Sequence, residues 1–295
     1  MKTTLLTPQQ WQAAGQYLHF NGRQIFYRQS GGGKPVLLLI HGFPTASWDW
    51  YRIWDRLADH FHLIAADMLG FGFSDKPRPY RYRIAEQADL QEHLLQELGC
   101  RKAHILAHDY GDTVAQELLA RRLTGDLSFD IQSVVFLNGG LFPGIHQARP
   151  IQKLLISPIG RYMTPFLGKS NLAKTFRRIF GPHTQPTEEE IDQFWELIDH
   201  QEGKTVIPLL IRYMQERNQY RDRWVGALQK SLLPMLLING ALDPVSGAHM
   251  AARYRKVVPR ARVVELKQIG HYPQVEAPVR TVDELLLFQR IGDLA

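Results

Sequence analysis

The sequence predicts an α/β protein built on a doubly wound, mostly parallel β-sheet with flanking helices. Three observations lead to this class. Short, continuous apolar runs recur along the chain and end near Gly, Asp or Asn, as expected of strands that are buried on both faces. Helical patterns separate these runs, which is typical of parallel sheets. A chain of 295 residues is also long enough to bury the large core that such a sheet needs.

The elements can be placed in chain order. Residues 17–29 alternate between apolar and polar types and turn at Asn21-Gly22, a dipeptide favoured in tight β-hairpins. A helical pattern over residues 83–99 ends in Gly99, a common helix terminator. The main strands are predicted at residues 35–40, 62–67, 103–107, 133–138, 235–240 and 261–266.

The alternation of strand and helix stops between Leu141 and Leu232. This segment is helical in pattern, and Thr187 followed by Glu190 predicts a capping box at the start of one helix. An insertion of this size predicts a helical cap, or lid, over the edge of the sheet where open α/β sheets bind ligands. The expected organisation is a core domain of residues 1–140 and 233–295 with a helical cap domain of residues 141–232.

Composition excludes several function classes. The 35 basic and 29 acidic residues form no long basic run, which argues against a nucleic-acid partner. No apolar run reaches the roughly 18 residues of an integral membrane segment. The lone Cys100 and the absence of a signal-peptide pattern favour a cytoplasmic protein. We expect a monomer or a homodimer. No ligand spacing suggests a metal, and no dinucleotide pattern follows a strand, so we expect no cofactor.

Three polar residues follow three of the predicted strands. Asp109 follows the strand at 103–107, Asp243 follows that at 235–240, and His271 follows that at 261–266. Nucleophile, acid and histidine in this order form the expected triad of an α/β hydrolase. The sequence therefore predicts a catalytic triad of Asp109, Asp243 and His271.

Asp109 occupies the centre of a predicted nucleophile elbow. Small residues two positions before and after it, Ala107 and Gly111, allow the sharp turn from strand to helix. The N–H of Tyr110 at the start of that helix and the N–H of Phe43 are the expected oxyanion-hole donors. An aspartate stands here where most hydrolases place a serine.

The segments HGFPTASWDW, DMLGFGFSDKP, AHDYGD, GALDP and GHYPQVEAP give the chain a clear resemblance. It resembles the α/β-hydrolase superfamily, in the branch of the epoxide hydrolases and haloalkane dehalogenases. The likeness covers nearly the whole chain, is weakest over residues 145–205, and is greatest to an animal subgroup that shares HDYGDTVAQELL and RWVGAL.

This resemblance implies a cofactor-free hydrolase that acts on a small to medium apolar substrate. Asp109 would attack a saturated carbon to form an alkyl ester, and His271, oriented by Asp243, would activate the water that hydrolyses it. Epoxide hydrolysis is the first expectation and haloalkane dehalogenation the second. Ester hydrolysis with Asp109 as a base is a third possibility, and a catalytically silent ligand-binding homologue is a fourth.

The cap residues bear on this choice. Relatives that cleave haloalkanes hold the halide with a Trp after the nucleophile and with an Asn or a second Trp, but this chain has Tyr110 and Phe43 at the corresponding positions. Epoxide hydrolases use two lid tyrosines as donors, for which Tyr213 and Tyr162 are the candidates, with Tyr220 also in the lid. The further candidate substrate contacts are His41, which alternatively fixes its loop, and Trp195, which alternatively packs the lid.

Asp112 lies one helical turn after Asp109. We expect its carboxylate to cap the first turn of the elbow helix, with Gln116 as a hydrogen-bonding neighbour. The alternative is that two like charges repel and weaken Asp109 as a nucleophile.

Overall fold

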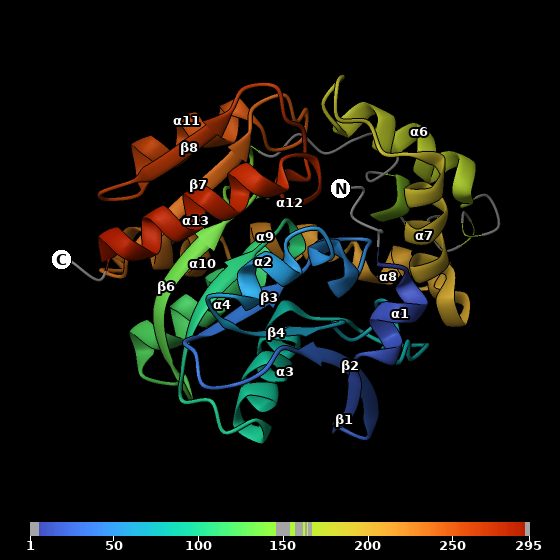
Figure 1. Cartoon of the computed structure of the whole chain (residues 1–295), viewed down its shortest axis with the longest axis horizontal. Coiled ribbons are helices and arrows are strands. Elements are labelled where there is room, and N and C mark those ends of the chain that lie inside the picture. Colours follow the sequence, from blue (N-terminus) through green and yellow to red (C-terminus); the bar gives the residue numbers. More distant parts are fainter. Residues whose placement is uncertain (1–5, 146–153, 157–161, 163, 165–166, 293–295) are drawn as a thin grey trace.

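An eight-stranded sheet forms the centre of the molecule among the residues that the structure describes (Figure 1). The structure is a computed structural model and describes residues 6–145, 154–156, 162, 164 and 167–292. The strand order is β1-β2-β4-β3-β5-β6-β7-β8. The strands are β1 Gln16–Phe20, β2 Arg23–Gln29, β3 Val36–Ile40, β4 His62–Ala66, β5 Lys102–Ala107, β6 Asp130–Phe136, β7 Met235–Gly240 and β8 Arg262–Leu266.

The first two strands form the predicted hairpin. Phe20 pairs with Arg23, so Asn21 and Gly22 make the turn, and both have positive φ angles of 49° and 71°. Antiparallel pairing of β2 with β4 attaches this hairpin to the sheet, and every later pairing is parallel. The predicted doubly wound, mostly parallel sheet is confirmed.

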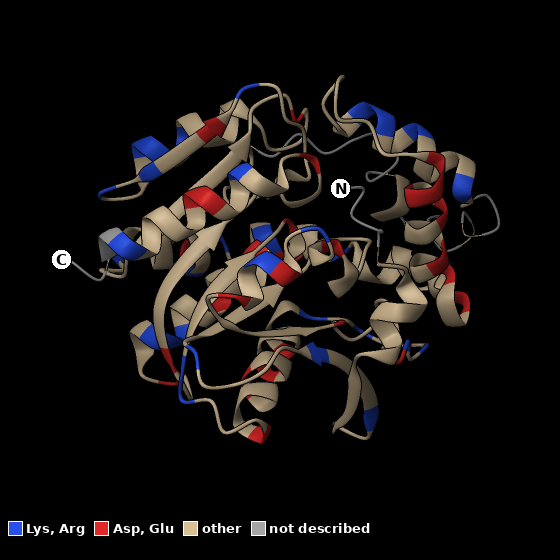
Figure 2. Ribbon diagram, in the orientation of Figure 1, with Lys and Arg blue, Asp and Glu red and all other residues tan. Residues whose placement is uncertain are grey.

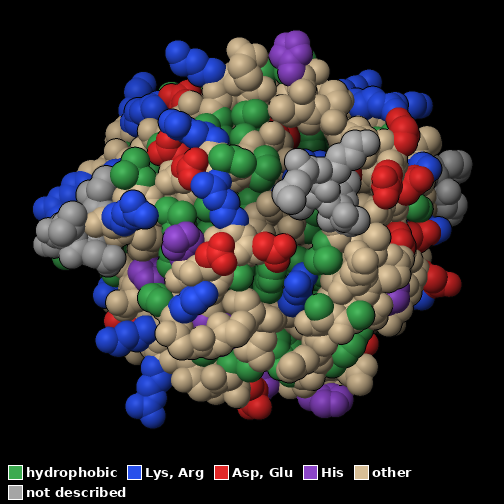
Figure 3. Space-filling view, viewed as in Figure 1, with side chains coloured by type: hydrophobic (Ala, Val, Ile, Leu, Met, Phe, Trp, Pro, Cys, Tyr) green, Lys and Arg blue, Asp and Glu red, His purple; other side chains and the backbone are tan. Residues whose placement is uncertain are grey.

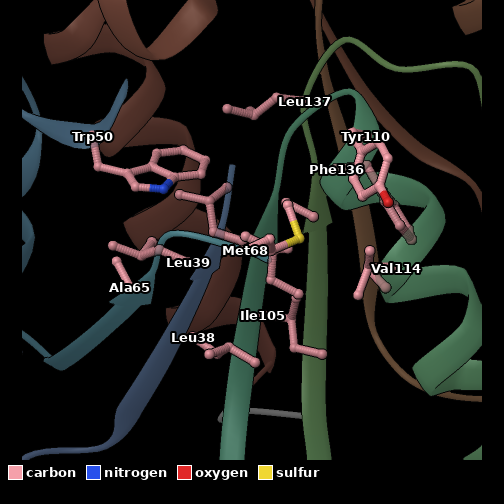
Figure 4. Close-up of a cluster of buried hydrophobic side chains, with 14 of the residues drawn as sticks. Leu38, Leu39, Trp50, Ala65, Met68, Ile105, Tyr110, Val114, Phe136 and Leu137 are labelled. Carbon is pink, nitrogen blue, oxygen red and sulfur yellow. The ribbon is translucent and has the colours of Figure 1, made fainter. Parts of the chain in front are cut away.

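The apolar runs form strands that are buried on both faces. In β3, every side chain from Leu37 to Ile40 is fully buried. Figure 4 shows Leu38 and Ile105 close together on neighbouring strands, and Phe136 beside Tyr110 of the elbow helix. A sheet of this kind presents the carboxyl ends of its parallel strands along one edge, where loops can carry functional residues.

Helices cover the sheet. The helices outside the long insertion are α1 Pro8–Ala13, α2 Trp54–Ala58, α3 Ile84–Glu97, α4 Tyr110–Thr124, α11 Ala248–Val257, α12 Pro273–Glu276 and α13 Pro278–Gly292. Helix α4 packs against α3, and an ion pair of 2.6 Å between Arg56 and Asp283 joins α2 to α13. The predicted helix at 83–99 is confirmed as α3, apart from its end residues.

Between β6 and β7, all the regular elements that the structure describes are helices, joined by turns and loops. The helices of this segment with described bounds are α6 Lys169–Ile179, α7 Glu188–Asp199, the 3-10 helix η4 His200–Thr205, α8 Ile207–Leu210, α9 Tyr213–Gln219 and α10 Arg221–Lys230. Figure 1 shows α6, α7 and α8 gathered on one side of the molecule, at the right of the view. The capping box at Thr187 and Glu190 is confirmed.

Salt bridges join the outer helices of this insertion. Lys169 pairs with Asp192, and Arg177 pairs with Glu188, so α6 and α7 are held side by side. Figure 2 shows the complementary charges on these two helices. Helix α10 instead packs on α4, the helix that follows the elbow. The insertion therefore contacts the part of the core that carries Asp109.

Charge is spread over the surface. On the face drawn in Figure 3, basic side chains lie among acidic and apolar ones rather than in one stripe. None of the helices in the described part of the chain is both long and apolar enough to cross a membrane.

Candidate active site

The elbow around Asp109 has the sharp geometry that its small neighbours predict. Asp109 lies between β5 and α4 with φ 49° and ψ −100°. Residues other than glycine rarely adopt this backbone conformation, and functional sites often retain it. A Cβ atom on Gly111 would overlap the carbonyl oxygen of Ile40 on the adjacent strand. Glycine at this position lets α4 start directly against β3, which brings Asp109 to the edge of the sheet.

Two donors face the Asp109 carboxylate. The backbone N–H of Phe43 donates to Oδ2 at 3.2 Å, as expected of an oxyanion-hole loop. Nη2 of Arg217 lies 3.8 Å from the other carboxylate oxygen, Oδ1. Tyr110, the second expected donor, is the first residue of α4, where backbone N–H groups have no intrahelical acceptor. The carboxylate thus sits in a cradle of N–H groups at 4% exposure.

Asp243 and His271 form a buried pair beside this carboxylate. Nδ1 of His271 lies 2.7 Å from Oδ2 of Asp243. Asp243 also accepts hydrogen bonds from the Ser246 hydroxyl at 2.7 Å and from the Asn138 side-chain amide at 3.0 Å. These donors fix the carboxylate, which in turn fixes the tautomer and orientation of the imidazole.

In this pair, Asp243 favours the protonated form of His271 and His271 favours the ionised form of Asp243. Burial lowers the pKa of His271, but the negative charges and hydrogen bond of Asp243, with Asp109, outweigh it and raise the pKa to about 9. Burial raises the pKa of Asp243, and the His271 charge and the hydrogen bonds overcome this effect, so its pKa lies well below the usual range. His271 is therefore protonated at neutral pH.

Two other histidines hold loops. Nε2 of His108 lies 2.9 Å from the carbonyl oxygen of His271, and burial lowers the pKa of His108 to about 3. His41 accepts a hydrogen bond from the Met68 N–H at 3.0 Å and lies 2.8 Å from the Gly42 carbonyl oxygen. Burial lowers the pKa of His41 to about 4, so both rings stay neutral at neutral pH.

A mostly apolar cavity of about 140 Å³ opens onto Asp109 and His271. The strand-end loops contribute Phe43, Pro44, Asp109, Val245, His271 and Tyr272. The segment between β6 and β7 contributes Leu155, Leu167, Gly168, Asn171, Leu172, Thr175, Phe176, Ile179, Trp195, Ile198, Ile207 and Ile211. This volume is of the order that accommodates a benzene-sized molecule.

The candidate substrate contacts differ in their positions. Trp195 lines this cavity from α7, whereas His41 is fully buried behind the Phe43 loop and does not line it. Tyr162 is 62% exposed and also lies outside the lining, because its side chain faces the surface. Tyr213 is buried against Tyr110 and Phe43, with ring centroids 4.7 and 5.9 Å away, and is not a lining residue.

The expected hydrogen bond between Asp112 and Gln116 is absent from the described contacts. The Gln116 amide donates instead to the carbonyl oxygens of Leu141 at 3.1 Å and Trp224 at 3.3 Å. Asp112 is fully buried, and neither of its carboxylate oxygens has a hydrogen-bond partner within the described residues. The expectation that Asp112 caps α4 by hydrogen bonding is therefore wrong, because its side chain turns into the protein interior.

The surroundings of Asp112 disfavour a charge. Burial raises the pKa of its carboxyl well above the ordinary value, and the Asp109 charge raises it further, while Arg217 opposes both. The Leu137 N–H beside it already donates to the carbonyl oxygen of Ala107 at 2.9 Å. These surroundings therefore favour the protonated, neutral form of the Asp112 carboxyl.

Sequence reasoning did not identify Arg217 or Asn138. Arg217 belongs to a stretch rich in charged residues and resembles a surface residue, yet it is 3% exposed. Asn138 is the last residue of the strand predicted at 133–138, close to the strand-end position that identified Asp109 and Asp243. In the described part of the chain, no group of three or more His, Cys, Asp or Glu side chains is arranged to hold a metal ion.

Comparison with known proteins places this geometry in context. A family model described as alpha/beta hydrolase fold matches residues 35–278. The mesoderm-specific transcript protein of Mus musculus is 44% identical over 284 residues, covering 91% of this chain and 84% of that protein. A Mycobacterium tuberculosis (strain ATCC 25618 / H37Rv) protein named provisionally as the hydrolase LipZ is 38% identical over 269 residues, covering 91% and 93%.

Solved structures of this fold are also similar. The haloalkane dehalogenase DbeA from Bradyrhizobium elkani USDA94 superimposes with a TM-score of 0.76 at 26% identity, covering 95% of this chain and 99% of that one. An alpha/beta hydrolase fold protein from Burkholderia ambifaria, 20% identical, has a TM-score of 0.76 and covers 92% and 96%.

Proposed function

Because the chain belongs to the α/β-hydrolase-fold family, we propose that it is a hydrolase that uses Asp109 as its nucleophile on a small apolar substrate. An epoxide is the first candidate substrate class. One observation carries the proposal: an apolar cavity is lined by both Asp109 and His271, and His271 is hydrogen-bonded to Asp243. The helical segment between β6 and β7 serves as the cap that closes this cavity.

The first half-reaction forms an ester. An oxygen of the Asp109 carboxylate attacks a saturated carbon, the new C–O bond forms, and the carbon–oxygen bond of the epoxide breaks. The ring oxygen leaves on the opposite side of that carbon, towards the cap, and takes up a proton there. A carboxylate suits this displacement, because the product ester can be hydrolysed in a second step.

The second half-reaction removes the product. Neutral His271 accepts a proton from water, and the resulting hydroxide attacks the carbonyl carbon of the ester. The N–H groups of Phe43 and Tyr110 stabilise the oxyanion that forms on the carbonyl oxygen. The bond between that carbon and the alkyl oxygen then breaks, and this oxygen takes the proton back from His271 and leaves as the alcohol. The carboxyl group left on Asp109 loses its proton, which restores the carboxylate.

The charge of Asp109 controls His271 between these steps. In the free enzyme, the charges of Asp243 and Asp109 raise the pKa of His271 to about 9. Esterification removes the negative charge of Asp109 and with it one of the influences that favour the imidazolium. His271 then releases its proton more readily, so the base becomes available when the ester needs water.

Tyr213 is the candidate proton donor for an epoxide oxygen. Its ring packs against Phe43 and under Arg217, whose Cζ lies 4.5 Å from the ring centroid. Burial and the Asp109 charge raise the pKa of the Tyr213 hydroxyl, so it keeps its proton throughout the neutral range. A small cap movement on substrate binding would bring this hydroxyl to the cavity.

Haloalkane dehalogenation is the second candidate function. It is favoured by Trp195 and Asn171, which carry an indole N–H and a side-chain amide and both line the cavity from the cap side. Such neutral donors suit a halide, which leaves as an anion and needs no proton. The structural similarity to DbeA is consistent with this second function.

Trapping of the ester tests the proposal. The His271→Gln variant is incubated with epoxides and with haloalkanes of about four to eight heavy atoms, and its intact mass is measured. An epoxide adds its whole mass, whereas a haloalkane adds its mass less one hydrogen halide. We expect an adduct from epoxides that maps to Asp109 and is absent in the double variant with Asp109→Asn.

Different results of this experiment distinguish the candidate functions. An adduct from haloalkanes alone would favour dehalogenation, and Tyr213→Phe should then have no effect on adduct formation. If the epoxide proposal holds, Tyr213→Phe should slow adduct formation by about 10²-fold or more, since general acids contribute about that much. No adduct and no turnover with either panel would contradict both and favour a silent ligand-binding protein.

A further inference from the structure

We propose that Arg217 is a positioning residue that keeps the negative charge on Asp109 rather than on Asp112. Arg217 reaches the elbow from α9, in the segment between β6 and β7. The inference rests on the proposed function, because the charge on Asp109 matters only if Asp109 is the nucleophile.

The guanidinium of Arg217 is fixed to the first turn of the elbow helix. Its Nη2 donates to the main-chain carbonyl oxygen of Asp109 at 3.0 Å, and its Nε donates to the Thr113 hydroxyl at 2.8 Å. The Tyr213 ring covers one face of the guanidinium. At 3% exposure, the Arg217 guanidinium is held in the protein interior.

Two carboxyl groups share this interior. Asp109 is 4% exposed and Asp112 is fully buried, one helical turn apart at the start of α4. Gly139 packs closely against both residues, since a Cβ atom there would overlap Oδ2 of Asp112 and lie 3.0 Å from the Cα of Asp109. Two carboxylates this close in a buried site do not both ionise readily, so one tends to hold a proton.

Arg217 decides which of the two is charged. Its Nη2 lies 3.8 Å from Oδ1 of Asp109, and the Phe43 N–H donates to the other oxygen, so Asp109 has two groups that favour the charged form. The Asp112 oxygens have no hydrogen-bond partner within the described residues. Asp109 therefore has an ion-pair partner and a hydrogen-bond donor for a negative charge, both of which Asp112 lacks among the described residues.

Other titratable groups also face Asp109 and must be considered. They are His271 on the loop after β8, His108 before the elbow, Tyr213 on α9 and Tyr272 beside the histidine. His271 is charged below about pH 9 and the pKa of His108 is about 3, while burial raises the pKa of both tyrosine hydroxyls. Between about pH 4 and 8, none of these four changes charge, so a shift in this range reports on Asp109 and Asp112.

The experiment follows ester formation against pH in the His271→Gln background, which isolates the first half-reaction. We expect Arg217→Met to move the acid limb of this rate to higher pH by about one unit or more, as loss of a nearby opposite charge does. Adding Asp112→Asn to the Arg217→Met variant should move the acid limb back to lower pH, because Asp109 is then the only carboxyl group left of the two. Arg217→Lys should retain part of the effect.

A matched control is available in the same segment. Arg223 of α10 pairs with Glu117 at 2.8 Å and does not contact Asp109. Arg223→Met should leave the acid limb unchanged. If Arg217→Met does not fold, Asp112→Asn alone remains informative, since removal of the competing carboxyl should move the limb to lower pH.

A second measurement does not depend on any substrate. The carboxyl carbon of Asp109 is followed by NMR in protein labelled at the aspartate carboxyl carbons and assigned by comparison with Asp109→Asn. In this titration, the midpoint for Asp109 is expected to move between the Arg217, Asp112 and Arg223 variants in the same direction as the acid limb of the rate. If no reagent forms an ester but the titration shifts, the proposed function fails while the role of Arg217 stands.

Two results would overturn the inference. One is a folded Arg217→Met protein in which Asp109 titrates as in the parent. The other is a uniform loss of rate at every pH that Asp112→Asn does not restore, which would assign Arg217 a purely structural role.

Discussion

At the scale of single residues, burial of Asp112 should appear as a pH-dependent cost in stability. The folded protein keeps a proton on this carboxyl, because its pKa is raised well above the ordinary value. The unfolded chain releases that proton above about pH 4. Unfolding therefore releases a proton, and stability falls as pH rises through the range between these two values.

Asp112→Asn removes this proton release. We expect its gain in unfolding free energy over the parent to increase with pH from about 4 upward, by at most about 1.4 kcal/mol per pH unit. Urea unfolding of both proteins at a series of pH values measures the difference. A difference that is constant over this range would contradict the neutral state of Asp112.

Sequence reasoning identified residues where chemistry and strand ends coincide. Asp109, Asp243 and His271 each follow an apolar run, and the structure brings the second and third within hydrogen-bonding distance beside the first. Arg217 gave no such signal, since a helix rich in charged residues is usually a solvated surface. Its role depends on how α9 packs on α4, and a single sequence does not contain that contact.

At the scale of elements, the junction of β5 and α4 depends on one missing side chain. Gly111→Ala would push a methyl group into the Ile40 carbonyl oxygen, which belongs to backbone and cannot rotate away. We expect a loss of about 1–3 kcal/mol in unfolding free energy, the range for overpacking, and a large loss of ester formation as Asp109 moves.

Gly226 in α10 provides the matched control. A Cβ atom there meets no other atom within 4 Å, and its φ is not positive. Gly226→Ala should raise the unfolding free energy by about 0.5–1 kcal/mol through helix propensity and leave ester formation unchanged. Thermal unfolding of both variants tests the contrast, and equal effects would refute the steric account of the elbow.

Element types were easier to predict than element ends. Every predicted strand of the main sheet is present; each apolar run is largely buried except in the edge strand β8, where only Leu266 is buried. Strand β6 nevertheless begins at Asp130, three residues before the run at 133–138, since Asp130 pairs with Lys102 through backbone hydrogen bonds that need no apolar side chain. Burial predicts where a strand is, and pairing determines how far it extends.

At the scale of the whole molecule, the cavity between core and insertion should set the size of the substrate. Its volume of about 140 Å³ suits a benzene-sized molecule, and Leu172 of α6 forms part of its wall. Leu172→Ala should shift the preference to longer members of a homologous substrate series, with the ratio of kcat/KM as the measure. An unchanged preference would show that the substrate does not reach α6.

The wide separation of the site residues along the chain has a kinetic consequence. Asp109 and His271 are more than half the chain apart, and the insertion with Arg217 is synthesised between them. Contacts between distant segments form slowly, because the intervening chain must first lose its freedom. During synthesis, strands β3 to β6 can assemble while the elbow is still without its histidine. On the proposed mechanism, the site becomes complete only after β8 and the loop that carries His271 have joined the sheet.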